Sequence, residues 1–176
     1  LLFVGIAVAA IGLLGFVVFF SDHRSITNRT FLAFSLITSL WGVINYFDYV
    51  VTSKEISLWL TRGVLFFAVW QAFFLFQLFY VFPRPEISFS RLYKYFLIPL
   101  VVLTSLLTLS SFVFLSVTGF SESGAPLTEK GLGIIIFGMV AVGLVLGGLV
   151  DLTFKTKKSS GVEKVQFRLV LIGASV

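Results

Sequence analysis

The sequence predicts an all-α fold, a multi-pass bundle of transmembrane helices, and two observations carry that prediction. Of the 176 residues, 58% are hydrophobic and only 12% are charged, which leaves too few polar side chains to cover a soluble core. Apolar stretches of about 20 residues, each long enough to cross a bilayer, alternate with short polar links. We therefore expect a single membrane domain over residues 1–176 and no soluble module.

Five apolar stretches are long enough to span the membrane, and a sixth begins near the end of the sequence. The predicted helices cover residues 1–20, 31–51, 58–82, 95–117 and 132–154, with a partial helix at 165–176. Asn28 is a suitable N-cap for the second helix, and Pro83 is expected to end the third. Because the chain starts with Leu and the last stretch is short, we expect a domain truncated at both ends.

The distribution of basic residues predicts the orientation of these helices. Lys and Arg concentrate in the first, third and fifth connections, whereas the second and fourth connections with their flanks hold only Lys54, Arg62 and Lys130. The concentrated set is Arg24, Arg29, Arg84, Arg91, Lys94, Lys155, Lys157, Lys158 and Lys164. By the positive-inside rule, loops 21–30, 83–94 and 155–164 are cytoplasmic and the N-terminus is outside.

A candidate polar cluster lies toward the outer ends of the second and third helices. Trp41, Asn45 and Asp48 are spaced to share one helix face, and Arg62 lies about one turn into the next helix from the same side. Asp48 and Arg62 should therefore have similar depth and could pair. One interpretation is an outward-opening ligand pocket. The simpler one is a structural ion pair, or snorkelling side chains, because charges near helix ends cost little.

Small residues mark candidate helix-packing faces. Gly5, Ala9 and Gly12 lie on one face of the first helix, and Gly143 and Gly147 form a Gly-x-x-x-Gly step in the fifth. This spacing lets helix backbones approach closely, within a bundle or between subunits. The third helix is rich in aromatic residues, which suit a bundle core, although they could also line a site for a hydrophobic ligand such as a quinone or lipid.

The motifs of enzymes and metal sites are missing from the sequence. The chain has no Cys, and its single histidine, His23, lies in a short polar loop. There is no phosphate loop, dinucleotide-binding turn or zinc motif, so we expect no catalytic residue, no metal and no cofactor in these residues. Asp151 precedes Lys155 by four residues, as in a helical salt bridge. The scattered basic clusters do not suggest a nucleic-acid partner.

Several short stretches resemble one known family. The first link and second helix read Thr27-Asn28-Arg29-Thr30-Phe31-Leu32-Ala33-Phe34-Ser35-Leu36, with Trp41 and Asn45-Tyr46 beyond; the third helix ends Phe79-Tyr80-Val81-Phe82-Pro83; and the last link reads Gly161-Val162-Glu163-Lys164-Val165-Gln166, leading to Leu171-Ile172-Gly173. Together with the small-residue fifth helix, these resemble the N-terminal seven-helix membrane (sensor) region of bacterial sensor histidine kinases.

The resemblance implies a sensor and signal-relay region in the bacterial inner membrane. It implies a catalytic output domain C-terminal to this fragment, a full-length chain that is a protein histidine kinase of a two-component system, homodimers, and a cytoplasmic response regulator as partner. The sequence departs from the family pattern because most of helix six and all of helix seven are missing. Two other classes stay open: a fragment of a small transporter or permease, and a structural membrane subunit.

Overall fold

The computed structural model describes the backbone of residues 2–83 and 88–175, which form six α-helices and one hairpin. The helices are α1 (Leu2–Ser21), α2 (Ile26–Val50), α3 (Lys54–Val81), α4 (Ile98–Thr108), α5 (Gly133–Lys158) and α6 (Gly161–Ser175); a π-helical turn, η1 (Tyr93–Leu97), leads into α4, and the strands are β1 (Phe114–Phe120) and β2 (Pro126–Lys130). Arg84 of the predicted cytoplasmic loop and the terminal residues 1 and 176 lie outside the described residues.

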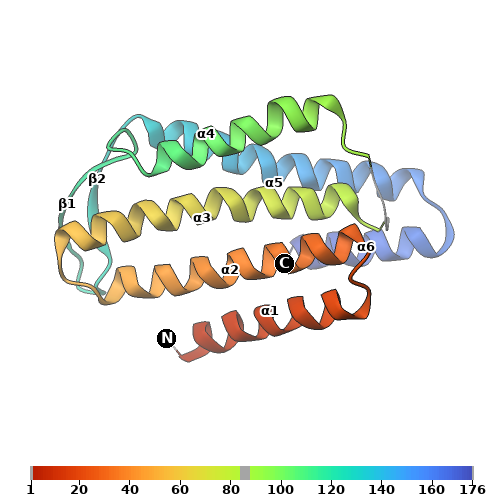
Figure 1. Ribbon diagram of the computed structural model, residues 1–176, viewed down its shortest axis with the longest axis horizontal. Coiled ribbons are helices and arrows are strands. Elements are labelled where there is room, and N and C mark those ends of the chain that lie inside the picture. The colour runs from red at the N-terminus through yellow and green to blue at the C-terminus, as the bar shows by residue number, and fades with distance from the viewer. Residues whose placement is uncertain (1, 84–87, 176) are drawn as a thin grey trace.

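The helices run along a common axis, with α3 in the centre of the bundle (Figure 1). α3 packs against α2, α4 and α5, while α1 packs against α2 and α6 against α5. The hairpin and the α2–α3 turn lie at one end, which we call the hairpin end. The α1–α2 turn, the connection before η1 and the α5–α6 turn lie at the other, and we call it the basic end because it carries Arg24, Arg91, Lys94 and Lys158.

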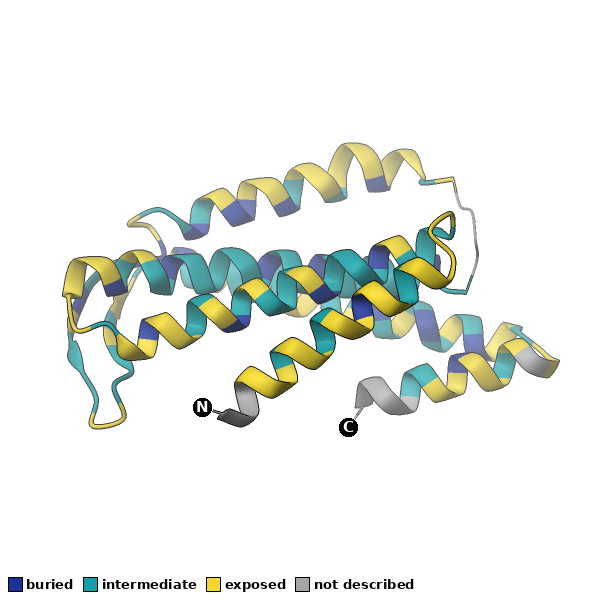
Figure 2. Cartoon of the chain, turned by 60° about the horizontal axis from the view of Figure 1, so that its bottom comes forward, coloured by how far each residue is buried: buried dark blue, intermediate teal, exposed yellow. Residues whose placement is uncertain are grey.

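Length and hydropathy allow several of these helices to cross a membrane. Within the described residues, α2, α3 and α5 are long and apolar enough to do so, and α1 and the η1–α4 segment contribute shorter apolar helices at Gly5–Ser21 and Tyr93–Thr108. Exposed residues follow the outer faces of α1 and α4 (Figure 2), and many of them are large and apolar, such as Leu13 and Leu103. An exposed apolar surface of this kind suits lipid, so the structure is consistent with a multi-pass helical membrane bundle.

The main core lies where α3 meets η1, α4 and α5. It contains Val69, Ala72, Phe73, Tyr93, Val101 and Leu144. The Tyr93 ring stacks on Phe89 with 4.5 Å between ring centroids and on Tyr80 with 5.6 Å. η1 ends two residues before Pro99, whose missing N–H interrupts the regular helical hydrogen bonds. The aromatic stack therefore holds the start of the fourth helical segment against α3.

The chain is helical as predicted, except that the predicted fourth span gives way to a hairpin between residues 109 and 130. The helix predicted at 95–117 ends at Thr108 in the structure. The connection to the fifth helix is an antiparallel hairpin of β1 with β2. The apolar run from Phe112 to Val117 looks like a continuing span, but it contains the aromatic and β-branched residues that also favour strands. Val113, Phe114 and Val117 are buried in the structure.

The predicted N-cap of the second helix is also wrong. α2 begins at Ile26, so Ser25 occupies the N-cap position. The Asn28 side chain instead donates hydrogen bonds to the carbonyl oxygens of Val18 at 3.0 Å and Asp22 at 3.1 Å. Asn28 thus supplies a donor to the C-terminal end of α1, where the last carbonyls of a helix have no partner within it. It fixes the α1–α2 turn at the basic end.

The residues predicted to form packing faces lie in different surroundings. A Cβ atom placed at Gly12 would lie 3.3 Å from the Ser39 hydroxyl, and one at Gly147 would lie 3.6 Å from the Phe76 ring, so both face a neighbouring helix. Ala9 is exposed, and the space beside Gly5 and Gly143 is open. In each predicted packing face, only one residue contacts another described helix: Gly12 in the first face and Gly147 in the second.

The closest helix approaches use neighbouring glycines. A Cβ atom at Gly15 would lie 2.6 Å from Ser35 Cβ, and one at Gly42 would lie 2.5 Å from Val8 Cγ2, which brings α1 and α2 together. Gly148 makes the close contact between α5 and α3, where an added Cβ would lie 2.9 Å from the Phe79 ring. These positions are buried, so a side chain there has little room to move.

We expect Gly148→Ala to destabilise the bundle by about 1–3 kcal/mol, because the added methyl group forces α5 away from α3. Gly143→Ala is the matched control one turn away: its methyl group meets open space, and alanine favours the helix. Equilibrium unfolding in mixed detergent micelles measures both. Equal stability of the two variants would contradict the close α3–α5 contact.

Candidate functional site

The hairpin lies across the N-terminal end of α3 and forms a polar site with it. β1 pairs with β2 from Phe114 opposite Lys130 to Phe120 opposite Pro126, with two irregularities in register. Both strands contact α3. Gly131 follows β2 and packs directly against the backbone of Phe112. A Cβ atom at Gly131 would lie 2.2 Å from the Phe112 carbonyl oxygen, so glycine is required there. The buried face of β1 therefore rests on α3, and its backbone is available to side chains of that helix.

Asp48, in the last turn of α2, is buried and accepts hydrogen bonds from α3. Ser57 Oγ donates to Asp48 Oδ1 at 3.1 Å, and Thr61 Oγ1 lies 3.1 Å from both carboxylate oxygens. Ser57 and Thr61 are four residues apart, so they share the face of α3 that meets α2. The carboxylate thus joins the C-terminal end of α2 to the N-terminal half of α3.

Arg62 is buried on α3 and joins this helix to the hairpin. Its Nη2 donates a 2.6 Å hydrogen bond to the carbonyl oxygen of Phe114, the first residue of β1. The guanidinium carbon lies 5.2 Å from the centroid of the Trp59 ring, within the range of a cation–π interaction. The Nε atom is buried without a hydrogen-bond partner in the described part of the chain. One donor of the guanidinium is therefore unused.

Two further contacts attach the hairpin to the helix ends. Lys54 Nζ, at the first residue of α3, donates to the Thr118 carbonyl oxygen at 2.8 Å. At the hairpin turn, Gly124 has φ +85° and lies against α2, where a Cβ would come within 2.8 Å of the Tyr49 carbonyl oxygen. The hairpin is therefore held by α3 at its base and middle and by α2 at its tip.

The structure brings the predicted residues Asp48 and Arg62 to the same end of the bundle but gives them different partners. Asp48 bonds to hydroxyls of α3 and Arg62 to the hairpin, and no ion pair joins the two. Trp41 is partly buried, and its Nε1 atom has no hydrogen-bond partner among the described residues. Asn45 is also partly buried, one turn before Asp48. The four predicted residues thus form no single cluster; the bonded network consists of Asp48 with Ser57 and Thr61, and of Arg62 with Phe114.

Sequence reasoning missed the partners that complete the network. Ser57 and Thr61 could have been identified from the sequence as partners of Asp48. Their hydroxyls are four residues apart at the start of a helix, so they can face a carboxylate across a short turn. The Phe114 carbonyl could not have been identified from the sequence, because every residue has a backbone carbonyl and the strand itself was not predicted. The hairpin is the part of the site that only the structure reveals.

A second polar contact lies at the basic end of α3. Lys155 Nζ donates to the carbonyl oxygens of Phe79 at 2.8 Å and Tyr80 at 2.6 Å, and it lies 2.9 Å from Asp151 Oδ2. The predicted i, i+4 salt bridge is therefore confirmed. The ammonium group caps the last turn of α3, where helix carbonyls lack partners and a cation is favoured. Lys155 fixes α5 to the end of α3.

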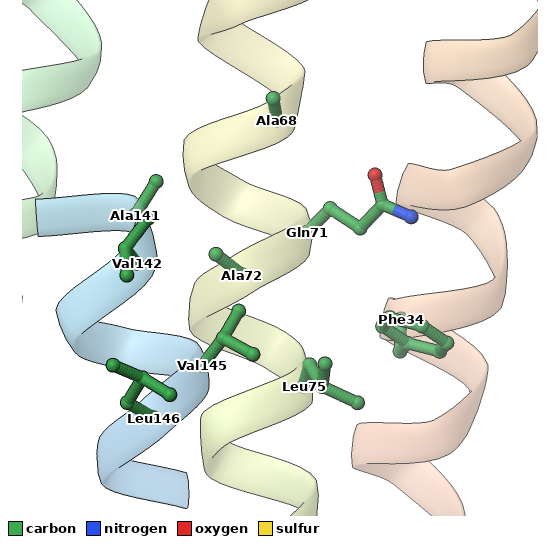
Figure 3. A pocket seen from close by; sticks show the side chains of 9 residues that line it. All are labelled: Phe34, Ala68, Gln71, Ala72, Leu75, Ala141, Val142, Val145 and Leu146. Atoms are coloured by element: carbon green, nitrogen blue, oxygen red, sulfur yellow. The ribbon is translucent and has the colours of Figure 1, made fainter. Parts of the chain in front are cut away.

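A cavity of about 420 Å³ opens between α2, α3 and α5 in the middle of the bundle. Figure 3 shows its lining residues: Phe34 from α2; Ala68, Gln71, Ala72 and Leu75 from α3; and Ala141, Val142, Val145 and Leu146 from α5. The lining is apolar except for Gln71, whose amide points toward α2. Within the described chain, no group of three or more His, Asp or Glu residues could hold a metal ion, and His23 is exposed.

Comparison with known proteins identifies one family. Residues 3–176 match a family model described as the N-terminal 7TM region of histidine kinase. No curated protein and no solved structure matches the chain. The match covers almost the whole sequence, including the polar network, the hairpin and the cavity.

We expect Thr61→Val to lower the free energy of unfolding by about 1 kcal/mol more in the natural sequence than in an Asp48→Asn background. The reason is that loss of the hydroxyl leaves the buried Asp48 carboxylate with one hydrogen-bond donor fewer. A double-mutant cycle from unfolding in mixed micelles measures this coupling. Thr153→Val is the control, since that hydroxyl bonds to the Leu149 carbonyl of its own helix at 2.7 Å. Coupling as small as that of the control would show that Asp48 does not depend on Thr61.

Proposed function

Because the chain belongs to the family of N-terminal 7TM regions of histidine kinases, we propose that it is the sensor and signal-relay region of a bacterial two-component receptor. The catalytic output domain would be C-terminal to these residues and would act on a cytoplasmic response regulator. The receptor would work as a homodimer in the inner membrane. The region itself would perform no bond chemistry and would act by changing the packing of its helices.

The observation that carries this proposal is that α3 is bound to the hairpin at one end and to α5 at the other. Arg62, near the start of α3, binds the hairpin backbone, and Lys155 binds the carbonyls of Phe79 and Tyr80 near the end of the same helix. A helix held at both ends transmits a displacement along its axis, because its own hydrogen bonds keep its length fixed. Events at the hairpin can thereby reach α5 at the basic end.

The proposed mechanism is a shift between two packings of the bundle. A ligand or a change in the membrane that binds one hairpin position better than another would favour one arrangement of α3. Lys155 would pass the movement to α5, and the short turn at residues 159–160 would pass it to α6 and then to the output domain. Close-packed helices have few stable arrangements, so a small movement at the hairpin can select between them.

The charges of the structure support a cytoplasmic basic end. Arg24, Arg91, Lys94, Lys157 and Lys158 lie in or next to its connections, whereas the hairpin end carries few basic residues. The positive-inside rule then puts the hairpin outside, where it would meet an external stimulus. If the chain were a transporter fragment, we would expect charged or broken helices at the membrane midplane. The buried charges Asp48 and Arg62 lie near helix ends instead, which counts against this alternative.

Cysteine labelling tests this orientation, since the sequence contains no Cys. In a full-length receptor with any other cysteines replaced, we expect a membrane-impermeant maleimide to label Glu122→Cys in the hairpin turn of intact spheroplasts. Lys157→Cys should react only after the membrane is permeabilised. Both positions are exposed in the structure, so the membrane alone should distinguish them. The reverse labelling pattern would overturn the proposed orientation.

Arg62 variants test the signalling role in the full-length receptor. We expect Arg62→Met to change the basal autophosphorylation rate by about fivefold or more, because it releases the hairpin from α3. Arg62→Lys, which keeps a donor for the Phe114 carbonyl, should lie closer to the natural protein. Leu103→Ala, on the exposed face of α4, is the control. Phosphate transfer from labelled ATP in membrane vesicles measures all four proteins.

Two results would count against the proposal. No phosphate incorporation by the natural receptor would show that it has no kinase output. An unchanged rate in Arg62→Met, with faster amide hydrogen exchange in β1, would show that the hairpin is released without any effect on signalling.

A further inference from the structure

The central cavity, of about 420 Å³, has one face of α3 as its floor and α2 and α5 as its two walls. Figure 3 shows α3 lying between these walls. Both walls pack against α3, but within the described chain they make few close contacts with each other. Val142 and Leu146, which line the cavity from α5, are exposed. The cavity therefore opens between α2 and α5 to the outer surface of the bundle, where lipid would lie.

The cavity is hollow because α3 carries small residues on this face. Ala68 and Ala72 lie on the floor, and Ala141 lines the cavity from α5. The rest of α3 is rich in large aromatic residues: Phe66, Phe67, Phe73, Phe74, Phe76 and Phe79. Close-packed protein interiors rarely leave voids much larger than a water molecule, whereas pockets for small organic ligands measure about 300–1,000 Å³. The volume of the central cavity falls in the range of ligand pockets.

Gln71 is the only polar residue in the lining, and its amide makes no hydrogen bond within the described chain. Figure 3 shows this amide pointing toward α2. Gln77 provides the contrast, because it lies on the same helix and donates to the Thr30 hydroxyl of α2 at 3.4 Å. The Gln71 amide is therefore free to bind an occupant of the cavity.

The position of Gln71 along α3 places its amide deep in the membrane. Gln71 lies 17 residues after Lys54 and 10 residues before Val81, which is about 26 Å and about 15 Å from the two ends of α3 at about 1.5 Å per residue. If α3 crosses the bilayer, the amide lies within the hydrocarbon region, which is about 30 Å thick. No water is available there to satisfy an amide. An occupant with a hydrogen-bonding group is therefore favoured over a plain hydrocarbon chain.

The same depth selects the chemistry of the occupant. The ester and phosphate groups of a phospholipid lie at the surfaces of the hydrocarbon region, so only its acyl chains could reach Gln71. A charged group would be costly, since none of the described lining residues carries an opposite charge. A neutral carbonyl fits, because its oxygen accepts a hydrogen bond from the Gln71 amide and it has no donor of its own to leave unpaired.

We propose that the central cavity binds a neutral, lipid-soluble carbonyl compound of the quinone type, with a ring carbonyl accepting a hydrogen bond from the Gln71 amide. The apolar ring would contact the alanine, valine and leucine side chains of the lining and the Phe34 ring. The apolar tail would leave between α2 and α5 into the lipid. The inference goes beyond the proposed function, because binding at this cavity does not require that the bundle signals to a kinase.

Competitive photolabelling of the full-length receptor in quinone-free nanodiscs tests this site. An azido-quinone is the label, decylubiquinone is the competitor, and mass spectrometry locates the labelled peptides. We expect saturable labelling of the peptides of α3 and α5 that line the cavity. Gln71→Leu should weaken competition by decylubiquinone about tenfold, because it removes the hydrogen bond. Gln77→Leu is the matched control and should leave competition unchanged, since its amide bonds to Thr30 and does not line the cavity.

Ala141→Leu is a second test that keeps the amide and fills part of the cavity, so it should reduce the labelling of these peptides even if Gln71→Leu expresses poorly. Equal competition in Gln71→Leu and the natural receptor would overturn the proposed hydrogen bond. Undiminished labelling in Ala141→Leu, or labelling that decylubiquinone does not displace, would overturn the site. Equal competition by decylbenzene, which has no carbonyl, would show that the cavity takes hydrocarbon only. None of these measurements depends on kinase activity, so they test binding separately from signalling.

Discussion

The hydrogen bond between Arg62 and the Phe114 carbonyl is the contact on which the hairpin end of the bundle depends. A guanidinium cannot lose its charge in a protein, and in an apolar surrounding it must find acceptors within the structure. The strand β1 provides that acceptor at 2.6 Å, and the Trp59 ring provides a second favourable surface at 5.2 Å. The hairpin is therefore part of the solvation of Arg62. A change in hairpin position changes how well this buried charge is satisfied, which gives the hairpin a direct energetic connection to α3.

Long apolar stretches with polar breaks leave few alternatives in lipid, so the sequence predicts a multi-pass helical bundle. It did not predict the hairpin, since Phe112 to Val117 has the apolar character of a membrane span and the aromatic and β-branched content of a strand at once. The polar site was predicted only in part, for a similar reason. Asp48 and Arg62 stand out as rare charges in apolar helices, but the Phe114 carbonyl that completes the site is present in any backbone. Likewise, Gly12 was identified by its spacing, whereas the closer contacts of Gly15 and Gly42 depend on how two helices cross.

At both ends of α3 a cation binds backbone carbonyls, but α3 supplies the cation at one end and the carbonyls at the other. At the hairpin end, a cation on α3 binds a carbonyl of the hairpin, and at the basic end, Lys155 on α5 binds carbonyls of α3. Both contacts pair a charge with backbone oxygens, so they resist substitution of the acceptor residues and respond mainly to backbone position. Asp48 adds a third contact, which ties α2 to the hydroxyls of Ser57 and Thr61. A displacement of α3 must then alter its contacts with α2, α5 and the hairpin together.

This arrangement explains why polar groups without partners can be tolerated in the middle of the bundle. The charged contacts lie near the ends of α3, where they fix its position, and the middle of the helix carries mostly small or apolar residues such as Ala68 and Ala72 with the single amide of Gln71. Because a neutral amide costs far less to leave unpaired than a charge, Gln71 can lie in the cavity lining without a partner, whereas Arg62 and Lys155 need the carbonyl acceptors that they have at the two ends of α3.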